Sequence, residues 1–288
     1  AAGASAQPTK IVVGRSVSSD ALPVVLADEQ GFFAKRGLDV KVIIIPVPSN
    51  IGPLLVSGSI QIGGGTPIGM LQGVEAGLPF KVVAGGTRFS ADNPTAGLVT
   101  RIGVKVEKPA DLIGKKVAVP GLNSGNYMLM LKWLKNADVP ANKVTFLEAP
   151  LPQMGDMLKS GNIDAAVIND PNRARVASSG NGTLSVPYMT EVNPDAVNIF
   201  WMANAKWADE NQSAVHSFRE ALNDAIKFIK ENPEKARDLE IKMLGSASPR
   251  LPTYNVDMKP QDIDFFIALG RELGVLEKAH DTSTLIAK

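Results

Sequence analysis

The sequence offers few of the side chains that catalysis requires. It contains no cysteine and two histidines, His216 within an expected long helix and His280 near the C-terminus. Neither histidine follows a predicted strand, no His-rich spacing indicates a metal site, and no Gly-x-Ser-x-Gly nucleophile motif occurs. An enzyme would therefore have no cysteine and only two histidines to act as nucleophile, general base or metal ligand. We therefore expect no catalytic residue, no bound metal and no cofactor.

The polar residues that could contact a small molecule instead follow the predicted strands. In open parallel sheets, ligands bind beyond the carboxyl ends of the strands, where helix N-termini converge. Ser, Thr, Asn and Gly at these positions form hydrogen bonds without adding net charge, which suits a small polar or anionic molecule. The candidate ligand-binding residues are Arg15, Ser18, Ser19, Asp20, Ser49, Asn50, Gly64, Gly65, Thr66, Thr87 and Arg88 in the first half, and Asn123, Ser124, Gly125, Asn126, Gln153, Asn169 and Asp170 in the second.

Three charged candidates each have two interpretations. Arg15 and Arg88 follow predicted strands, so either could pair with a carboxylate or sulfonate of a ligand. Most such arginines are instead solvated or bound to a surface acid. Asp170 could accept a hydrogen bond from a ligand, or it could cap the helix that Pro171 begins, and we favour the cap.

Two segments have the form of a ligand-binding turn. Gly63 to Thr66 predicts a glycine-rich turn before a helix, but it lacks the G-x-G-x-x-G spacing and the GK[ST] ending of nucleotide-binding loops. Its glycines either let backbone N–H groups approach a ligand or only make the turn. In "AVPGLNSGNYMLMLKWLKN", residues 118–136, Asn123 or Ser124 would cap a helix whose N-terminus faces the ligand. The alternative there is a capped helix without a ligand.

These candidates are positioned by one structural unit that occurs twice in the chain. "PVPSNIGPLLVSGSIQIGGGTP" (46–67) and "PLPQMGDMLKSGNIDAAVINDP" (150–171) are both 22 residues long, and their Pro-x-Pro openings lie 104 positions apart. Each copy is predicted as strand, helix, strand, helix, strand, helix. This alternation indicates a parallel sheet with right-handed crossovers. Two such units therefore predict two open α/β lobes.

The first copy has predicted strands at 11–13, 40–45 and 60–62, and a helix that Pro67 opens. The nearly all-apolar segment 40–45 predicts a strand buried on both faces. The second copy runs from 115 to about 180. Segments 96–104 and 198–207 predict extended crossovers between the lobes, and apolar residues at helical spacing predict C-terminal helices near 214–229, 236–244 and 265–273.

The composition points to a small partner. Of 288 residues, 44% are hydrophobic and 20% charged, and the net charge is +1 without blocks of like charge, so we expect no nucleic-acid partner. The longest apolar run, "VKVIIIPV", is interrupted by Pro46 and is too short to span a membrane. The polar start "AAGASAQPTK" favours an exported protein whose signal peptide has been removed.

The residues resemble a known family along nearly the whole chain. "KIVVGRSVSSDALPVVLADEQGFFAKRGLDVKVI", "LLVSGSIQIGGGTP", "DLIGKKVAVPGLNSGNYMLMLKWL" and "MLKSGNIDAAVINDP" are similar to the periplasmic solute-binding proteins of ABC importers of the nitrate, sulfonate, taurine and thiamine-precursor type. The resemblance implies a two-lobed periplasmic-binding-protein fold of type II, with two open, mainly parallel sheets joined by two hinge crossovers. Lobe 1 would comprise residues 10–95 and 200–288, and lobe 2 residues 96–199.

The resemblance also implies a function. A periplasmic monomer would close around a small organic anion or zwitterion, such as a sulfonate, a taurine-like molecule, nitrate or an aromatic acid. It would then deliver this ligand to an ABC permease in the inner membrane. Asn169 stands where many relatives carry an aromatic residue, which makes stacking of an aromatic ligand there less certain.

Two alternatives share the architecture. One is an enzyme of the thiamine-precursor-synthase type, against which the missing cysteines argue. The other is an effector-binding domain of a transcription regulator, which would need a DNA-binding helix-turn-helix that these residues do not supply.

Overall fold

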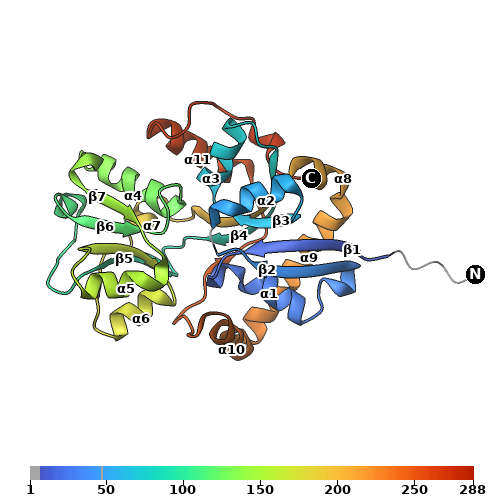
Figure 1. Ribbon diagram of the computed structural model, residues 1–288, viewed down its shortest axis with the longest axis horizontal. Coiled ribbons are helices and arrows are strands. Elements are labelled where there is room, and N and C mark those ends of the chain that lie inside the picture. Colours follow the sequence, from blue (N-terminus) through green and yellow to red (C-terminus); the bar gives the residue numbers. More distant parts are fainter. Residues whose placement is uncertain (1–6, 47) are drawn as a thin grey trace, which may run out of the picture.

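The computed structural model describes residues 7–46 and 48–288. Its elements form two groups that lie side by side, each built around its own β-sheet (Figure 1). We call the group around the six-stranded sheet the first lobe and the group around the five-stranded sheet the second lobe. Residues 1–6, which include most of the polar start, lie outside the described residues. The prediction of two α/β lobes is confirmed.

The sheet of the first lobe has the strand order β11-β4-β10-β3-β1-β2. Strand β1 (Thr9–Arg15) pairs in parallel with β2 (Leu38–Ile44) and β3 (Ile62–Gly65). Strand β10 (Val197–Asn204) returns from the second lobe and lies antiparallel between β3 and β4 (Phe80–Arg88). The short β11 (Thr253–Tyr254) completes the sheet beside β4.

The sheet of the second lobe repeats this plan, with the order β7-β6-β8-β5-β9. Strand β6 (Lys116–Val119) pairs in parallel with β7 (Thr145–Glu148) and β8 (Ala165–Asn169). Strand β5 (Ala96–Thr100) arrives from the first lobe and pairs antiparallel with β8 and with β9 (Thr183–Leu184). The central strand triplets β2-β1-β3 and β7-β6-β8 therefore correspond to the two copies of the repeated unit.

Helices cover both sheets (Figure 1). Those of the first lobe are α1 (Leu22–Glu29), α2 (Ile51–Ser57), α3 (Pro67–Glu75), α8 (Ala205–Glu210), α9 (Gln212–Glu231), α10 (Pro233–Leu244) and α11 (Pro260–Glu272). Those of the second lobe are α4 (Gly125–Asn136), α5 (Leu151–Lys159), α6 (Asn172–Ser178) and α7 (Tyr188–Val192). The three expected C-terminal helices correspond to α9, α10 and α11. In the described part of the chain, every helix is too short or too polar to cross a membrane.

The apolar core explains how the lobes are joined. One cluster lies in the first lobe between its sheet and helices α1 and α9, where Phe33 stacks on Phe218 with 5.5 Å between ring centroids. A second cluster continues from α3 of the first lobe through α11 into α4 of the second, and Phe266 of α11 is fully buried in it. The two chain segments that cross between the lobes, before β5 and before β10, run side by side: the Phe89 N–H of one donates to the Ala196 carbonyl of the other at 2.9 Å.

Three local predictions are wrong. Segments 96–104 and 198–207 are not crossovers: they lie mainly in β5 and β10, inside the two sheets, and the chain passes between the lobes just before each of them. Strand β2 is not buried on both faces: it is the edge strand of its sheet, and Ile44 is 51% exposed. The triple glycine does not form a turn, because Gly63, Gly64 and Gly65 belong to β3. A Cβ atom on Gly65 would lie 2.8 Å from the Met202 sulfur, so glycine there allows β10 to pack closely against β3.

Candidate functional site

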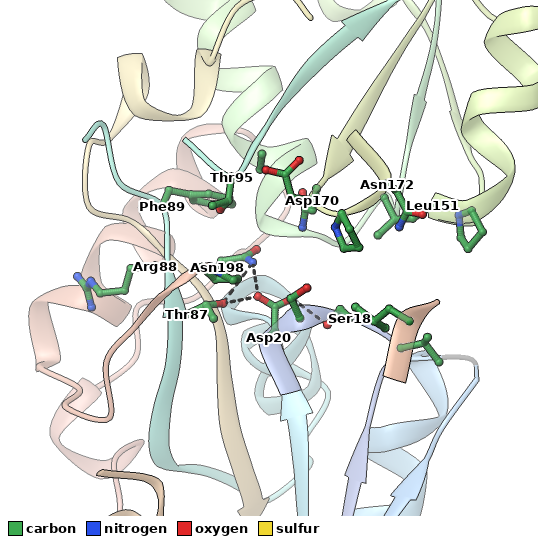
Figure 2. Close-up of a pocket in the computed structure, with 18 residues that line it drawn as sticks. Ser18, Asp20, Thr87, Arg88, Phe89, Thr95, Leu151, Asp170, Asn172 and Asn198 are labelled. Atoms are coloured by element: carbon green, nitrogen blue, oxygen red, sulfur yellow. Dashed lines mark hydrogen bonds between the residues drawn. The ribbon is translucent and has the colours of Figure 1, made fainter. Parts of the chain in front are cut away.

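A cavity lies between the lobes, next to the crossovers (Figure 2). Its volume is about 60 Å³, several times the roughly 10–15 Å³ that a single water requires, so it accommodates a small solute. The first lobe contributes Val17, Ser18, Ser19, Asp20, Thr87, Arg88, Phe89, Asn198, Leu244 and Pro252, and the second lobe and its crossover contribute Thr95, Ala96, Leu151, Pro152, Asn169, Asp170, Pro171 and Asn172. The cavity thus lies beyond the carboxyl ends of β1, β4 and β8.

Asp20 lies on the first-lobe side of the cavity, in the short 3₁₀ turn η1 (Ser19–Ala21) that follows β1. Its Oδ1 accepts hydrogen bonds from Thr87 Oγ1 at 2.7 Å and from Asn198 Nδ2 at 3.4 Å, and its Oδ2 accepts one from Ser18 Oγ at 3.0 Å (Figure 2). All three donors are uncharged. Burial raises the pKa of Asp20, and these hydrogen bonds oppose the rise.

Asp170 lies across the cavity, at the end of β8 in the second lobe (Figure 2). Its Oδ1 accepts hydrogen bonds from the Ala174 N–H and from Arg173 Nε, both at 3.2 Å, and its Oδ2 accepts one from Arg173 Nη2 at 3.3 Å. Burial raises the pKa of Asp170 although Arg173 opposes the rise. The carboxylate therefore satisfies the first turn of α6, as the favoured interpretation predicts, while it lines the cavity.

The two arginines expected to face a ligand do not present free guanidinium groups to the cavity. Arg88 points away from it (Figure 2) and binds two acids, Asp195 Oδ1 through Nε at 2.8 Å and Asp262 Oδ1 through Nη2 at 2.7 Å. Burial alone would lower the pKa of Arg88, but these two carboxylates raise it. Arg15 does not line the cavity: it is buried, and its Nη1 donates to the Ser16 carbonyl at 3.1 Å. Both guanidinium groups are therefore directed elsewhere.

Another group of candidates meets at a direct contact between the lobes, away from the cavity. Thr66 caps α3 by accepting from the Gly69 N–H, and its hydroxyl donates to the Asn123 carbonyl at 3.4 Å. Ser124, rather than Asn123, caps α4 by accepting from the Tyr127 N–H at 3.2 Å. The N-terminus of α4 therefore contacts the first lobe, and the contact with a ligand that was expected there stays a prediction.

The remaining candidates lie at other places. Gly125 lies next to the Phe266 ring of α11, and Gly64 and Gly65 lie within β3. The exposed residues Ser49, Asn50 and Gln153 do not line the cavity. Asn126 is 3% exposed, and its Nδ2 donates to Asn169 Oδ1 at 3.3 Å, so it supports a cavity residue from behind. None of these remaining candidates lines the cavity, so their contacts with a ligand stay predictions.

Seven of the candidates lie together around the cavity: Ser18, Ser19, Asp20, Thr87, Arg88, Asn169 and Asp170. Sequence reasoning missed Asn198, because the segment that contains it was predicted only as a crossover. In the structure Val197 pairs with Arg88, which places Asn198 beside Thr87 and Asp20. It also missed the apolar walls Phe89 and Leu151. Within residues 7–46 and 48–288, no group of three His, Cys, Asp or Glu residues is arranged to hold a metal.

The fold agrees with the comparisons to known proteins. The model of the family described as "NMT1/THI5 like" matches residues 18–236. The chain belongs to this family.

The chain is 23% identical over 231 residues to the taurine-binding periplasmic protein of Escherichia coli, covering 80% of the chain and 69% of that protein. It is 23% identical to the formylaminopyrimidine-binding protein of Halalkalibacterium halodurans, covering 73% of the chain and 63% of that protein. It thus spans about two thirds of the length of these relatives. Over 101 residues, 35% of the chain and 28% of the relative, it is 32% identical to the 4-amino-5-hydroxymethyl-2-methylpyrimidine phosphate synthase of Uromyces fabae.

Among solved structures, the periplasmic aliphatic sulphonate binding protein SsuA from Escherichia coli superposes with a TM-score of 0.78 at 18% identity, covering 97% of this chain and 98% of that one. At this identity the likeness shows the fold, which is the periplasmic-binding-protein fold expected from the sequence.

Proposed function

We propose that this protein is the solute-binding component of an ABC importer, located in the periplasm, and that it captures a small organic anion or zwitterion in the cavity between its lobes. The observation that carries the proposal is the composition of the cavity wall. The wall combines residues of both lobes and the side-by-side crossovers, so a bound solute would contact both lobes at once. Such a solute stabilises the closed arrangement by its differential contacts.

The family and the relatives support this function. Two relatives carry names that describe them as binding proteins, for taurine and for formylaminopyrimidine. In this proposal the protein acts as a monomer whose lobes comprise residues 10–95 with 200–288 and residues 96–199, except that residues 197–199 lie in β10 of the first-lobe sheet. The closed, loaded form then docks on a permease in the inner membrane.

The rival function is catalysis, which the relationship to the Uromyces fabae synthase brings into consideration. That relationship covers 35% of the chain. The described residues that line the cavity include no histidine, and the sequence contains no cysteine. Binding without chemistry therefore fits the cavity better.

A panel experiment separates the two functions. Thermal unfolding is measured in the presence of alkanesulfonates, amino-sulfonates, amino acids, nitrate, aromatic acids and aminopyrimidines. Each compound that stabilises the protein is then recovered, and its molecular mass is measured by mass spectrometry. A receptor is stabilised further as the ligand concentration rises above the Kd, by mass action, and the ligand is recovered unchanged. Recovery of an altered compound would establish an enzyme instead. Failure of the whole panel to stabilise the protein would contradict the proposed ligand classes.

A further inference from the structure

The charges on the cavity wall are compensated unequally. Three charged residues line the cavity in the described part of the chain: Asp20, Arg88 and Asp170. Arg88 is bound by Asp195 and Asp262, and Asp170 is bound by Arg173. Asp20 has the uncharged partners Thr87, Asn198 and Ser18 only. The cavity therefore presents one carboxylate that lacks an opposing charge.

Asp20 also retains the capacity to accept another hydrogen bond. An ionised carboxylate offers about four acceptor positions, two on each oxygen. Oδ1 uses two of them, for Thr87 and Asn198, whereas Oδ2 uses one, for Ser18. These donors come from β4, from β10 and from the loop before η1, so the carboxylate is held from three directions. A donor on the solute can occupy the remaining position on Oδ2 without displacing a protein partner.

A second carboxylate behind η1 fixes Asp20 in place. Glu240 of α10 is fully buried and accepts hydrogen bonds from the Ser19 hydroxyl and from the Ser248 hydroxyl and N–H, the last at 2.7 Å. Tyr254 Oη donates to the Ser19 carbonyl at 2.7 Å. The hydrogen bonds of Glu240 and Tyr254 to Ser19 therefore fix the backbone next to Asp20. Glu240 also adds negative charge behind this end of the cavity, opposite to what a simple anion would require.

We propose that Asp20 binds a protonated nitrogen of the solute, so that the ligand is a small zwitterion with an ammonium group rather than a simple anion. An N⁺–H group that reaches Oδ2 forms a charge-assisted hydrogen bond, which is stronger than a neutral one. The amides of Asn169 and Asn172 across the cavity are available to the acidic end of the solute. This inference rests on the proposed function. It narrows that function from anion or zwitterion to zwitterion, and it assigns Glu240 as a positioning residue.

Matched pairs of probes test the inference on the intact protein. Calorimetry at pH 7 compares the affinity for 2-aminoethanesulfonate with that for ethanesulfonate, and the affinity for 3-aminopropanoate with that for propanoate. Nitrate serves as the simple anion. We expect the amine member of at least one pair to bind tenfold or more tightly than its partner, and nitrate not to bind. Asp20→Asn should reduce the affinity for that amine at least tenfold and remove most of the difference in affinity between the two members of the pair. The exposed Asp39→Asn on β2 is the matched control and should behave like the wild type.

The outcomes distinguish failure of the ammonium inference from failure of the proposed receptor function. Equal binding of the two members in every pair that binds, or tight binding of nitrate, would overturn the ammonium inference while the receptor function stands. An amine preference that survives in Asp20→Asn would also overturn it. Absence of binding by every probe here and in the wider panel would contradict the proposed function and this inference with it. The wild-type comparison of matched pairs stays decisive even where a variant fails to fold.

Discussion

The two rims of the contact between the lobes differ in their chemistry. Along the packed rim, which we define by α3, the N-terminus of α4 and helix α11, the lobes share one apolar cluster around Phe266. At its outer edge Lys132 of α4 binds Glu272 of α11 at 2.7 Å. Along the hollow rim, defined by η1, α10 and the starts of α5 and α6, polar side chains and apolar walls that include Phe89 and Leu151 surround a cavity. One rim holds the lobes together and the other leaves room between them.

This difference indicates how the lobes would move. Buried apolar packing resists separation, whereas the walls of a cavity are not packed against each other and lose fewer contacts when the cavity opens. We therefore infer that opening occurs at the hollow rim while the packed rim serves as the pivot. Helix α11 makes the difference, because it follows the two repeated units in the chain and packs against α3 and α4 together.

The largest effect is expected from removing the centre of the packed rim. Phe266→Ala should reduce the free energy of unfolding by about 3–5 kcal/mol, because it removes a fully buried ring from the cluster that both lobes share. Denaturant unfolding followed by circular dichroism measures it. The neighbouring Phe265→Ala, at a partly buried ring, is the matched control and should cost less than half as much. Equal losses would show that the packed rim does not depend on Phe266.

A smaller and pH-dependent effect is expected where α11 binds the end of β4. Burial disfavours ionised Asp262, but the hydrogen bonds from Arg88 and from the Lys259 N–H, with the positive charges of both residues, together outweigh it, so the pKa of Asp262 lies below its ordinary value. The resulting stability is present above the unfolded-state pKa, near 4, and is lost as the pH falls through the folded-state pKa. Asp262→Asn should therefore cost about 1–3 kcal/mol at pH 7.

The pH series provides the check on this interpretation. Urea unfolding of the wild type and of Asp262→Asn at pH 7, 5 and 3 should show a difference that shrinks toward pH 3. A difference that is independent of pH would mean that the ionised pair with Arg88 is not its cause.

The smallest effect, with the opposite sign, is expected at the hollow rim. Because burial raises the pKa of Asp20, its ionisation costs stability in the solute-free protein, and stability is lost as the pH rises from the unfolded-state pKa to the folded-state pKa. Asp20→Asn should then increase the melting temperature of the solute-free protein at pH 7, with a gain below about 1 kcal/mol. The gain should vanish at pH 3. A loss of stability at pH 7 would show that the carboxylate serves the fold rather than the solute.

The fold was predictable because the sequence patterns that indicate it are either local or repeated along the chain. The two 22-residue segments with Pro-x-Pro openings 104 positions apart defined the repeated unit, and helical periodicity defined α9 and α11. The wrongly predicted elements depend on distant neighbours. Strand β2 is an edge strand because no strand pairs with its outer side, and the glycines lie beside Met202 because β10, more than a hundred residues further along the chain, inserts next to β3.

The candidate site was predictable to the extent that strand ends determine it. Asp20, Thr87 and Asp170 were found because each lies at or just after a strand, where the cavity forms. The pairing of Arg88 with Asp262, 174 positions away, could not be found, because nothing in the local sequence shows where α11 docks. The charge character of the cavity therefore required the structure, since it depends on which ionic groups are already paired.

The central claim is that a solute closes the hollow rim while the packed rim stays in place. Because the chain has no native cysteine, spin labels can be attached to Gln153→Cys with Ile241→Cys across the hollow rim, and to Asn136→Cys with Arg271→Cys across the packed rim. Distances are measured with and without the compound that stabilises the protein most in the panel. The account predicts a shorter distance across the hollow rim and an unchanged distance across the packed rim. Unchanged distances across both rims, or equal changes in both, would contradict it.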